Sequence, residues 1–225
     1  MFAMRENLTQ TIEDYLKIIY ELTASEGRAM TNQIAARLGV QPASVTGMVK
    51  RLATSDPPLV EYRKHRGVLL TPAGRQVALE IIRHHRLLEL FLHETLGYTW
   101  DEVHDEADRL EHVISEDMEE RIAQALGDPL LDPHGKPIPS RELRLPADST
   151  LRLKELRTGQ QAVVQRVEDD DPEFLRYLHD IGILPQTHLR VLDYSSFDEN
   201  LQLQIGEQVV VLGPAVTQQI YVEVE

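Results

Sequence analysis

Two histidines and two carboxylates recur at helical spacing in the middle of the chain. At about 100° per residue they fall within an arc of roughly 100° on one face of a helix; they are His104, Asp108, Glu111 and His112. The neighbouring face of the same helix is apolar and carries Val103, Ala107, Leu110, Ile114 and Met118. A cation held at this border would be partly shielded from water, so the stretch predicts a metal-binding face on a core-facing helix.

A second pair of potential ligands, His85 and Glu89, lies one turn apart on the preceding expected helix. An acidic helix with one or two histidines is most often a solvated surface, but two such pairs on successive helices favour a metal site. All six side chains offer nitrogen or oxygen, and the chain has no cysteine, which excludes a thiolate zinc site. Such ligands suit Mn(II) or Fe(II), although Zn(II) and Ni(II) bind them at least as tightly in vitro.

Length and hydropathy set the class of protein. With 225 residues the chain is long enough for two or three small domains. It has no apolar run of transmembrane length and no signal-peptide pattern, so we expect a cytoplasmic protein that does not associate with a membrane. The net charge of −14 argues at first against a nucleic-acid partner.

The charge, however, is unevenly distributed. Residues 1–75 hold ten Lys and Arg against seven Asp and Glu, whereas residues 101–126 hold two against ten. A basic N-terminal module joined to an acidic helix predicts a polyanion-binding head followed by a cation-binding segment.

The basic module has the pattern of a helix-turn-helix. A short helix over residues 32–38, with Thr31 as N-cap and Gly39 as C-cap, is followed by a second helix over residues 42–52. In such a motif the second helix enters the major groove, where polar and basic side chains contact bases and phosphates. The candidate DNA contacts are Gln41, Pro42, Ser44, Thr46 and Lys50.

Two short strands are expected next, over residues 59–62 and 67–70, and the segment between them is basic. A hairpin directly after a helix-turn-helix is typical of the wing of a winged helix, whose charges meet the phosphate backbone. A solvated turn with a run of charges is the alternative interpretation. The candidate contacts at the tip are Arg63, Lys64 and Arg66.

Two longer helices follow the wing. The first, over residues 72–96, is apolar on more than one side in its second half, which favours packing against a second subunit. The second begins at residue 99 or 101, carries the central ligand face and ends near residue 126. A boundary segment rich in Pro and Gly, residues 127–147, comes next, and His134 within it is interpreted as an ordinary loop histidine.

From about residue 151 the hydrophobic periodicity changes from helical to alternating. A short helix over 172–182 and five short strands fit a small β-barrel; the strands are expected over 161–167, 188–193, 201–205, 208–212 and 220–224. The predicted fold is mainly α with a β-rich C-terminal part. Its expected domains are a winged helix-turn-helix (1–74), a helical metal-binding domain with a Pro-rich linker (75–146) and the barrel (147–225).

Four motifs are shared with one known family: Val103–Ala107 with Glu111–Val113, the segment from His85 to Glu89, the helix-turn-helix through Val45–Thr46, and His134–Gly135 with Pro137–Pro139. With them, nearly the whole chain resembles the diphtheria toxin repressor family of metal-dependent transcription regulators. The resemblance implies a homodimer with a winged helix, a metal-binding and dimerisation domain, and a C-terminal SH3-like barrel related to a ferrous-transport domain.

Carried over residue by residue, the resemblance implies two metal sites. One would use Asp14, from an amphipathic helix over residues 9–24, together with Asp108, Glu111 and His112. The other would use His85, Glu89 and His104, and would be completed by Glu168 and Asp171 of the barrel. Without the resemblance, the acidic run 168–171 would be interpreted as a solvated loop.

Three positions depart from the patterns of the family's branches. Asp14 and Asp108 stand where iron-responsive members have Met and Cys, so carboxylates replace two sulfur ligands and the resemblance favours the manganese-responsive branch. Lys17 stands where short manganese regulators have a Glu ligand, which favours a barrel-completed second site over their paired-metal geometry.

The expected function is that of a Mn(II)-sensing transcription regulator, a repressor of metal-transport genes, acting as a homodimer on a palindromic double-stranded DNA operator. An Fe(II)-dependent regulator of iron homeostasis is the alternative, and Zn(II), Ni(II), Co(II) and Cd(II) are further metals for these ligands in vitro. A metallohydrolase would need a substrate pocket or nucleophile motif that the sequence does not offer. A metal-independent regulator that senses an organic ligand is the third possibility.

Overall fold

The computed structural model describes residues 8–146, 149–168 and 171–225. This part of the chain forms two compact units, one that ends at His84 and includes Pro139–Arg144, and one made of His85–Ile138 and Leu145–Glu225. Helix α4 contributes residues to both units. None of the helices in the described ranges has the length and apolar character needed to cross a membrane.

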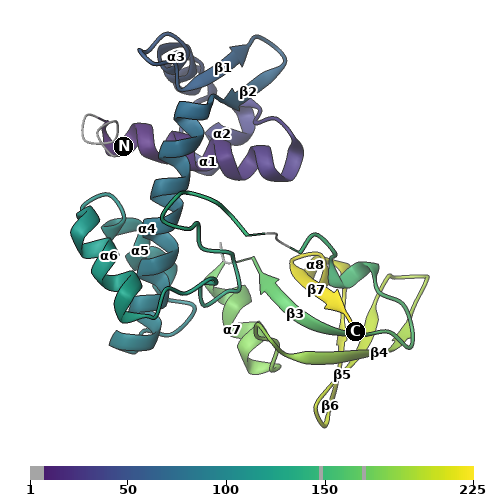
Figure 1. Ribbon diagram of the computed structural model, residues 1–225. Helices are drawn as coiled ribbons and strands as arrows, with labels where there is room; N and C mark the ends of the chain where they lie inside the picture. The colour runs from purple at the N-terminus through teal and green to yellow at the C-terminus, as the bar shows by residue number, and fades with distance from the viewer. Residues whose placement is uncertain (1–7, 147–148, 169–170) are drawn as a thin grey trace. The chain divides into compact units, whose positions relative to one another are not determined.

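The first unit is a winged helix-turn-helix (Figure 1), as predicted. Buried residues from each element form its core, among them Leu16, Ile34, Val49, Val68 and Val77. The hairpin is antiparallel, and the turn before the second helix of the motif passes through Gly39 at a φ of 63°. Its elements are α1 (Gln10–Glu26), α2 (Thr31–Leu38), α3 (Pro42–Ala53), β1 (Val60–Arg63), β2 (Gly67–Leu70) and the first half of α4 (Pro72–Leu96).

The start of α2 differs from the prediction by one residue. Met30, not Thr31, is the N-cap, and its backbone N–H donates to Oε1 of Gln33 at 2.8 Å. The Gln33 side chain therefore satisfies a backbone donor before the helix, a capping role that the choice of Thr31 overlooked.

The single central helix expected from residue 99 or 101 to 126 is wrong, because two helices occupy this stretch. They are α5 (Val103–Leu110) and α6 (Glu116–Ala125). Ser115 ends the irregular segment between them as the N-cap of α6, and its hydroxyl accepts a hydrogen bond from the Met118 N–H. Acidic residues then fill the first turn of α6, where the helix dipole favours them.

The apolar second half of α4 is buried within the single chain. Leu87, Leu88 and Leu92 are almost inaccessible and belong to a core that includes Val103 and Ile122. The apolar character on several sides of α4 therefore has an explanation that does not need a second subunit.

The C-terminal part contains the five predicted strands, in one antiparallel sheet of order β6-β5-β4-β3-β7 (Figure 1). Two short helical elements, η2 and α8, were not predicted. The elements are η2 (Leu153–Glu155), β3 (Gln161–Val167), α7 (Pro172–Asp180), β4 (His188–Tyr194), β5 (Leu201–Ile205), β6 (Gln208–Leu212), α8 (Pro214–Thr217) and β7 (Ile220–Val224).

The loop over residues 131–137 packs closely against β3. The backbone N–H of Val167 donates to the carbonyl of His134 at 3.0 Å. Gly135 has a φ of 85°, and a Cβ at this position would lie 2.0 Å from the backbone oxygen of Gln165. Trp100, which precedes α5, is buried in the core of the sheet. The helical and β-rich parts of the second unit are thus joined through backbone contacts that need glycine at position 135.

We predict that Gly135→Ala lowers the free energy of unfolding of the metal-free protein by about 1–3 kcal/mol, because both the positive φ and the close approach to β3 oppose a side chain. Denaturant unfolding measures this loss. Gly127→Ala is the matched control, since Gly127 has a φ of 76° and no atom within 4 Å of an added Cβ. Equal losses in the two variants would mean that the loop does not depend on its close contact with β3.

Candidate metal centre

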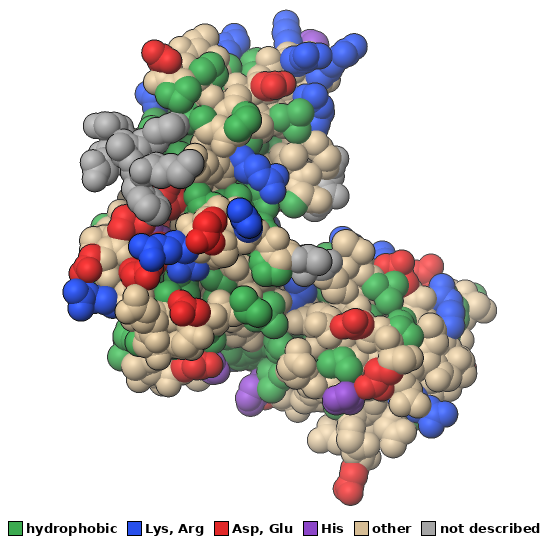
Figure 2. All heavy atoms as spheres, in the orientation of Figure 1, with side chains coloured by type: hydrophobic (Ala, Val, Ile, Leu, Met, Phe, Trp, Pro, Cys, Tyr) green, Lys and Arg blue, Asp and Glu red, His purple; other side chains and the backbone are tan. Residues whose placement is uncertain are grey.

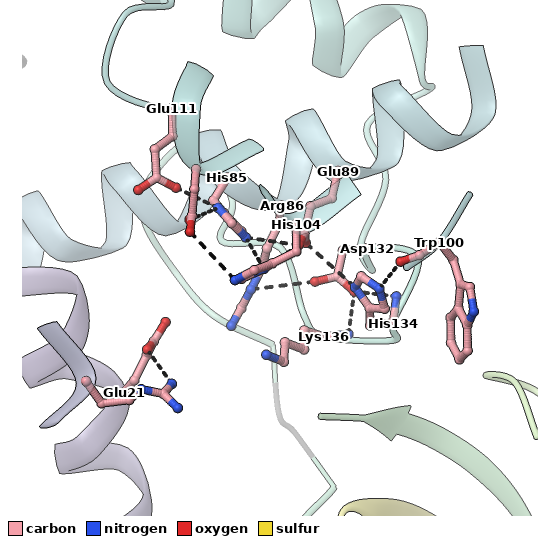
Figure 3. A network of polar contacts seen from close by, with 12 residues as sticks. Glu21, His85, Arg86, Glu89, Trp100, His104, Glu111, Asp132, His134 and Lys136 are labelled. Atoms are coloured by element: carbon pink, nitrogen blue, oxygen red, sulfur yellow. Dashed lines mark hydrogen bonds and ion pairs between the residues drawn. The ribbon is translucent and has the colours of Figure 1, made fainter. Parts of the chain in front are cut away.

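Six of the predicted ligands lie together in the second unit and form what we call the His85 cluster. Figure 3 labels four of them, His85, Glu89, His104 and Glu111. They come from successive elements: two from α4, two from α5 and two from the turn that follows α5. The pairs on α4 and on α5 are each four residues apart, which aims both side chains of a pair to the same side of its helix. The members are His85, Glu89, His104, Asp108, Glu111 and His112.

His85 lies at the centre of the cluster. Its Nδ1 is 2.6 Å from Oε2 of Glu111 and 3.2 Å from Oδ1 of Asp108, and its Nε2 is 2.9 Å from Oε1 of Glu89. Carboxylate oxygens accept hydrogen bonds, so these contacts are satisfied together when both ring nitrogens carry protons. A metal ion binds through the lone pair of a ring nitrogen, so it competes with a proton for that nitrogen.

His104 and Asp108 extend the cluster on α5. Nδ1 of His104 lies 3.1 Å from Oε1 of Glu89, and its Nε2 lies 3.7 Å from Oδ2 of Asp108. Ligand atoms of His85, His104 and Asp108 all lie within 4.8 Å of one another. The resemblance assigned Asp108 to one site and the two histidines to the other, whereas in this arrangement Asp108 lies beside both histidines.

Glu111 and His112 occupy the turn after α5. Glu111 is buried, and its Oε1 lies 3.3 Å from Nε2 of His112. The other oxygen of Glu111 is the one that contacts His85. Glu111 therefore connects the ligands proposed for one site with those proposed for the other.

Burial and charge define what the cluster can bind. Burial raises the pKa of the Glu89 carboxyl, but the positive charge at His85 and the contacts with His104 and His134 outweigh it and hold that pKa well below its usual range. Glu89 is thus an anion inside the protein, and such a charge requires compensation. Converging carboxylate oxygens and imidazole nitrogens fit a divalent cation of borderline hardness, and no sulfur donor belongs to the cluster.

The two barrel residues have other roles in the structure. Oε1 of Glu168 accepts hydrogen bonds from the Tyr221 hydroxyl and from Arg166. Oδ1 of Asp171 accepts from backbone N–H groups at the start of α7 and caps that helix. The structure does not bring either carboxylate into the His85 cluster, and Asp169 and Asp170 lie outside the described residues.

Asp14 lies on α1 in the first unit. Its neighbours Tyr15 and Leu16 are buried in the same core as Ile34 and Val45 of the helix-turn-helix. A ligand bound to Asp14 therefore acts on a helix that shares its core with the helix-turn-helix.

Two buried ligand side chains were missed by the sequence analysis. His134, interpreted as an ordinary loop histidine, is fully inaccessible, and Asp132 is 5% exposed. The interpretation of His134 was wrong because the loop packs against β3 and its side chain turns inward. The Asp-x-His spacing within a glycine-containing loop was the available signal.

The predicted DNA contacts lie on the surface of the first unit. Gln41, the N-cap of α3, is exposed, as are Pro42, Ser44 and Lys50 of that helix. Thr46 is half-buried, and its hydroxyl donates to the Pro42 carbonyl. All three basic residues at the tip of the hairpin are exposed: Arg63, Lys64 and Arg66. Figure 2 shows Lys and Arg side chains gathered at this end of the unit, where α3 and the hairpin lie.

The chain matches three family models that together cover most of its length. Residues 7–68 match the N-terminal DNA-binding domain of iron-dependent repressors, and residues 71–140 match the metal-binding and dimerisation domain of the same proteins. Residues 151–224 match the FeoA domain.

Individual relatives agree with these matches. The chain is 34% identical to the iron-dependent repressor IdeR of Mycobacterium leprae over 82% of its own length and 85% of that protein. It is 32% identical to the diphtheria toxin repressor of Corynebacterium glutamicum, over 84% and 86% of the two chains. A solved manganese-dependent transcriptional repressor in complex with manganese is 40% identical, with a TM-score of 0.86 over 94% of this chain and 98% of that one. The manganese regulator SloR is 35% identical, with a TM-score of 0.80 over 97% and 100%.

We predict that His104→Ala weakens Mn(II) binding by about tenfold or more, because it removes a ligand that contacts both Glu89 and Asp108. Isothermal titration calorimetry on the full chain measures the affinity. His93→Ala, at an exposed position of α4, is the matched control. Unchanged binding by His104→Ala would exclude the His85 cluster as the Mn(II) site.

The same titration of Glu168→Ala combined with Asp171→Ala decides whether the barrel adds ligands. The number of Mn(II) ions bound per chain falls only if it does.

Proposed function

Because the chain belongs to the diphtheria toxin repressor family, whose members are metal-dependent, DNA-binding transcriptional repressors and not enzymes, we propose that its effector metal is manganese(II). The chain is thus a metal-dependent transcriptional repressor with a DNA-binding domain and a dimerisation domain, and it acts on DNA as a homodimer. The proposal concerns its metal, the ligands of that metal and the operator.

The observation that carries the proposal is the chemical type of the atoms that could ligate the metal. The His85 cluster offers only imidazole nitrogen and carboxylate oxygen, and the whole chain has no cysteine. Asp14 and Asp108 are carboxylates at the two positions where the resemblance expects sulfur in iron regulators. Oxygen donors favour Mn(II) relative to softer metals, and manganese-dependent repressors are among the similar solved structures.

Iron(II) is the second candidate effector. The iron-dependent repressors among the curated relatives favour it, because they match this chain over more than four-fifths of its length. Mn(II) and Fe(II) are bound by similar ligands, so the choice between them rests on the two carboxylates that replace sulfur.

We assign two ligand sets to the metal. Asp14, Asp108, Glu111 and His112 form the regulatory set, and His85, Glu89 and His104 form the second set, for which Glu168 and Asp171 stay predicted barrel ligands. A bound divalent cation neutralises these carboxylates, which otherwise repel one another. The proposed domain limits are those expected from the sequence: 1–74, 75–146 and 147–225.

The regulatory set couples metal to DNA because its members belong to different parts of the chain. Asp14 is carried by the helix that packs into the DNA-reading head, whereas Asp108, Glu111 and His112 belong to the dimerisation domain. When all four hold one ion, they fix each head within the dimer, and two recognition helices then meet half-sites about 34 Å apart on a palindromic operator. Metal affinity and operator affinity are consequently raised by the same factor. Genes for metal transport are the proposed targets.

Replacing Lys64 and Arg66 by alanine should weaken operator binding and flatten its dependence on salt. Each lost phosphate contact removes about 0.9 from the slope of log K against log salt concentration. Fluorescence anisotropy with labelled operator at several salt concentrations measures this slope. Lys154→Ala with Arg190→Ala, which removes the same charge from exposed positions of the barrel, should leave it unchanged. A wild-type slope in the Lys64 and Arg66 variant would exclude the wing from the interface.

Asp14→Ala should leave the metal-free protein folded and dimeric and should abolish the stimulation of DNA binding by Mn(II), because the head loses its ligand. Operator binding titrated with Mn(II), Fe(II) and Zn(II) under reducing, anaerobic conditions measures this. Asp14→Met supplies a thioether, so its response should shift from Mn(II) toward Fe(II). Asp180→Ala, an exposed aspartate of α7, is the control. Full Mn(II)-dependent DNA binding by Asp14→Ala would refute the regulatory set.

A further inference from the structure

A glycine lies in the interior of the second helix of the helix-turn-helix. This residue, Gly47, belongs to α3, which runs from Pro42 to Ala53. Glycine is a poor helix former because it loses more backbone freedom on folding than any other residue. An alanine at position 47 would therefore make α3 more stable, and the glycine needs another reason.

Neither the conformation of α3 nor its packing supplies that reason. Gly47 is not among the glycines with a positive φ, unlike Gly39 in the turn before α3. A Cβ built at Gly47 meets no atom of the described residues within 4 Å. At Gly74, by contrast, an added Cβ would lie 2.0 Å from the backbone oxygen of Leu59. The described part of the chain thus requires glycine at position 74 but accepts a side chain at position 47.

Gly47 lies at the centre of the outward face of α3 (Figure 1). Val45 and Val49 are buried in the core of the first unit. At about 100° per residue, Gly47 is about 200° from Val45 and about 160° from the other side of Val49, so it faces away from that core. Ser44 and Lys50, both exposed, lie about 60° to either side of Gly47.

The central position of this face sets how closely the helix can approach DNA. In a helix-turn-helix the outward face of the second helix enters the major groove, and its central residue lies nearest to the base edges. A glycine there leaves only hydrogen between the helix backbone and the base pairs. The C5-methyl of thymine is the apolar group that base pairs present in this groove. A backbone without a side chain leaves room for that methyl.

We propose that Gly47 is a specificity-determining residue of the DNA interface, which admits the C5-methyl of one thymine in each half-site against its Cα. This inference rests on the proposed mode of operator binding, in which α3 enters the major groove, and adds a residue to the contacts expected there. Glycine at position 47 lowers the stability of the helix and raises the affinity for the operator. The two effects have opposite signs, which distinguishes this role from a structural one.

The first measurement compares the full-length wild type with Gly47→Ala. The Tm of the metal-free chain should rise by about 2–4 °C, because alanine is the better helix former. A pool of random-sequence duplexes, enriched by binding to the metal-loaded wild type, supplies the DNA. Fluorescence anisotropy with the enriched duplex should show that Gly47→Ala binds about tenfold or more weakly, the effect of losing one base contact.

The second measurement removes the methyl group from the DNA. Each thymine of the enriched half-site is replaced in turn by uracil, which is thymine without its C5-methyl. At one position the replacement should weaken binding by the wild type, which loses an apolar contact. At that same position it should restore most of the affinity lost by Gly47→Ala, because the alanine methyl then occupies the vacated space. Uracil elsewhere should affect both proteins equally.

Ala36→Gly is the matched control, since Ala36 is an exposed residue of α2 in the same unit. It should lower the Tm and leave both the operator affinity and the response to uracil unchanged. This control shows that DNA affinity does not simply follow stability.

Three results would overturn the proposal. A lower Tm of Gly47→Ala would mean that the fold needs this glycine. Unchanged operator affinity would remove Gly47 from the interface, and a loss that no uracil restores would exclude the thymine methyl. Both proteins are compared at the same saturating metal, with Fe(II) used if Mn(II) does not activate the wild type. Activation by Fe(II) alone would therefore count against manganese sensing and not against the role of Gly47.

Discussion

The burial of one carboxylate, that of Glu89, is the constraint on which the second unit depends. An anion without water must be surrounded by donors or cations, since its desolvation otherwise costs several kcal/mol. One oxygen of Glu89 contacts both His85 and His104. These contacts help to fix the position of α4 relative to α5. The other oxygen faces the linker loop at His134. Leucines of α4 pack beside these polar contacts, so the hydrophobic core and the His85 cluster occupy the same interface between helices.

The two tasks of the molecule need opposite electrostatics, and the chain separates them. The DNA-reading head has its own apolar core and an exposed basic surface on α3 and the hairpin. The acidic residues are concentrated around α5 and α6. Without a cation the carboxylates repel one another, and a bound metal removes this repulsion. A ligand that binds one state of the protein better than another shifts the equilibrium toward that state. Asp14, an acidic residue in the basic module, is the residue through which that shift reaches the head in the proposed mechanism.

The barrel is integrated into the metal-binding part of the chain. Trp100, which lies between α4 and α5, contributes its ring to the barrel core, and the His134 carbonyl accepts from β3. The linker loop is therefore built into the structure on both sides. Glu168 and Asp171 are the barrel residues expected at the metal. In the structure Glu168 instead accepts a hydrogen bond from Tyr221, and Asp171 caps α7.

The sequence alone determined what depends on neighbours in the chain. Gly39 and Pro42 mark the turn and the start of α3, and the alternation of apolar and polar residues marks the strands β3–β7. His85 and Glu89 are one turn apart and lie on one face of α4, because a helix repeats every 3.6 residues. Ser115 was an available local signal that the prediction of one central helix overlooked. Only the tertiary structure decided which ligands meet. Asp108 lies beside the histidines, and His134 turns inward toward Glu89, because long-range packing of the loop on β3 sets these positions and no local pattern encodes it.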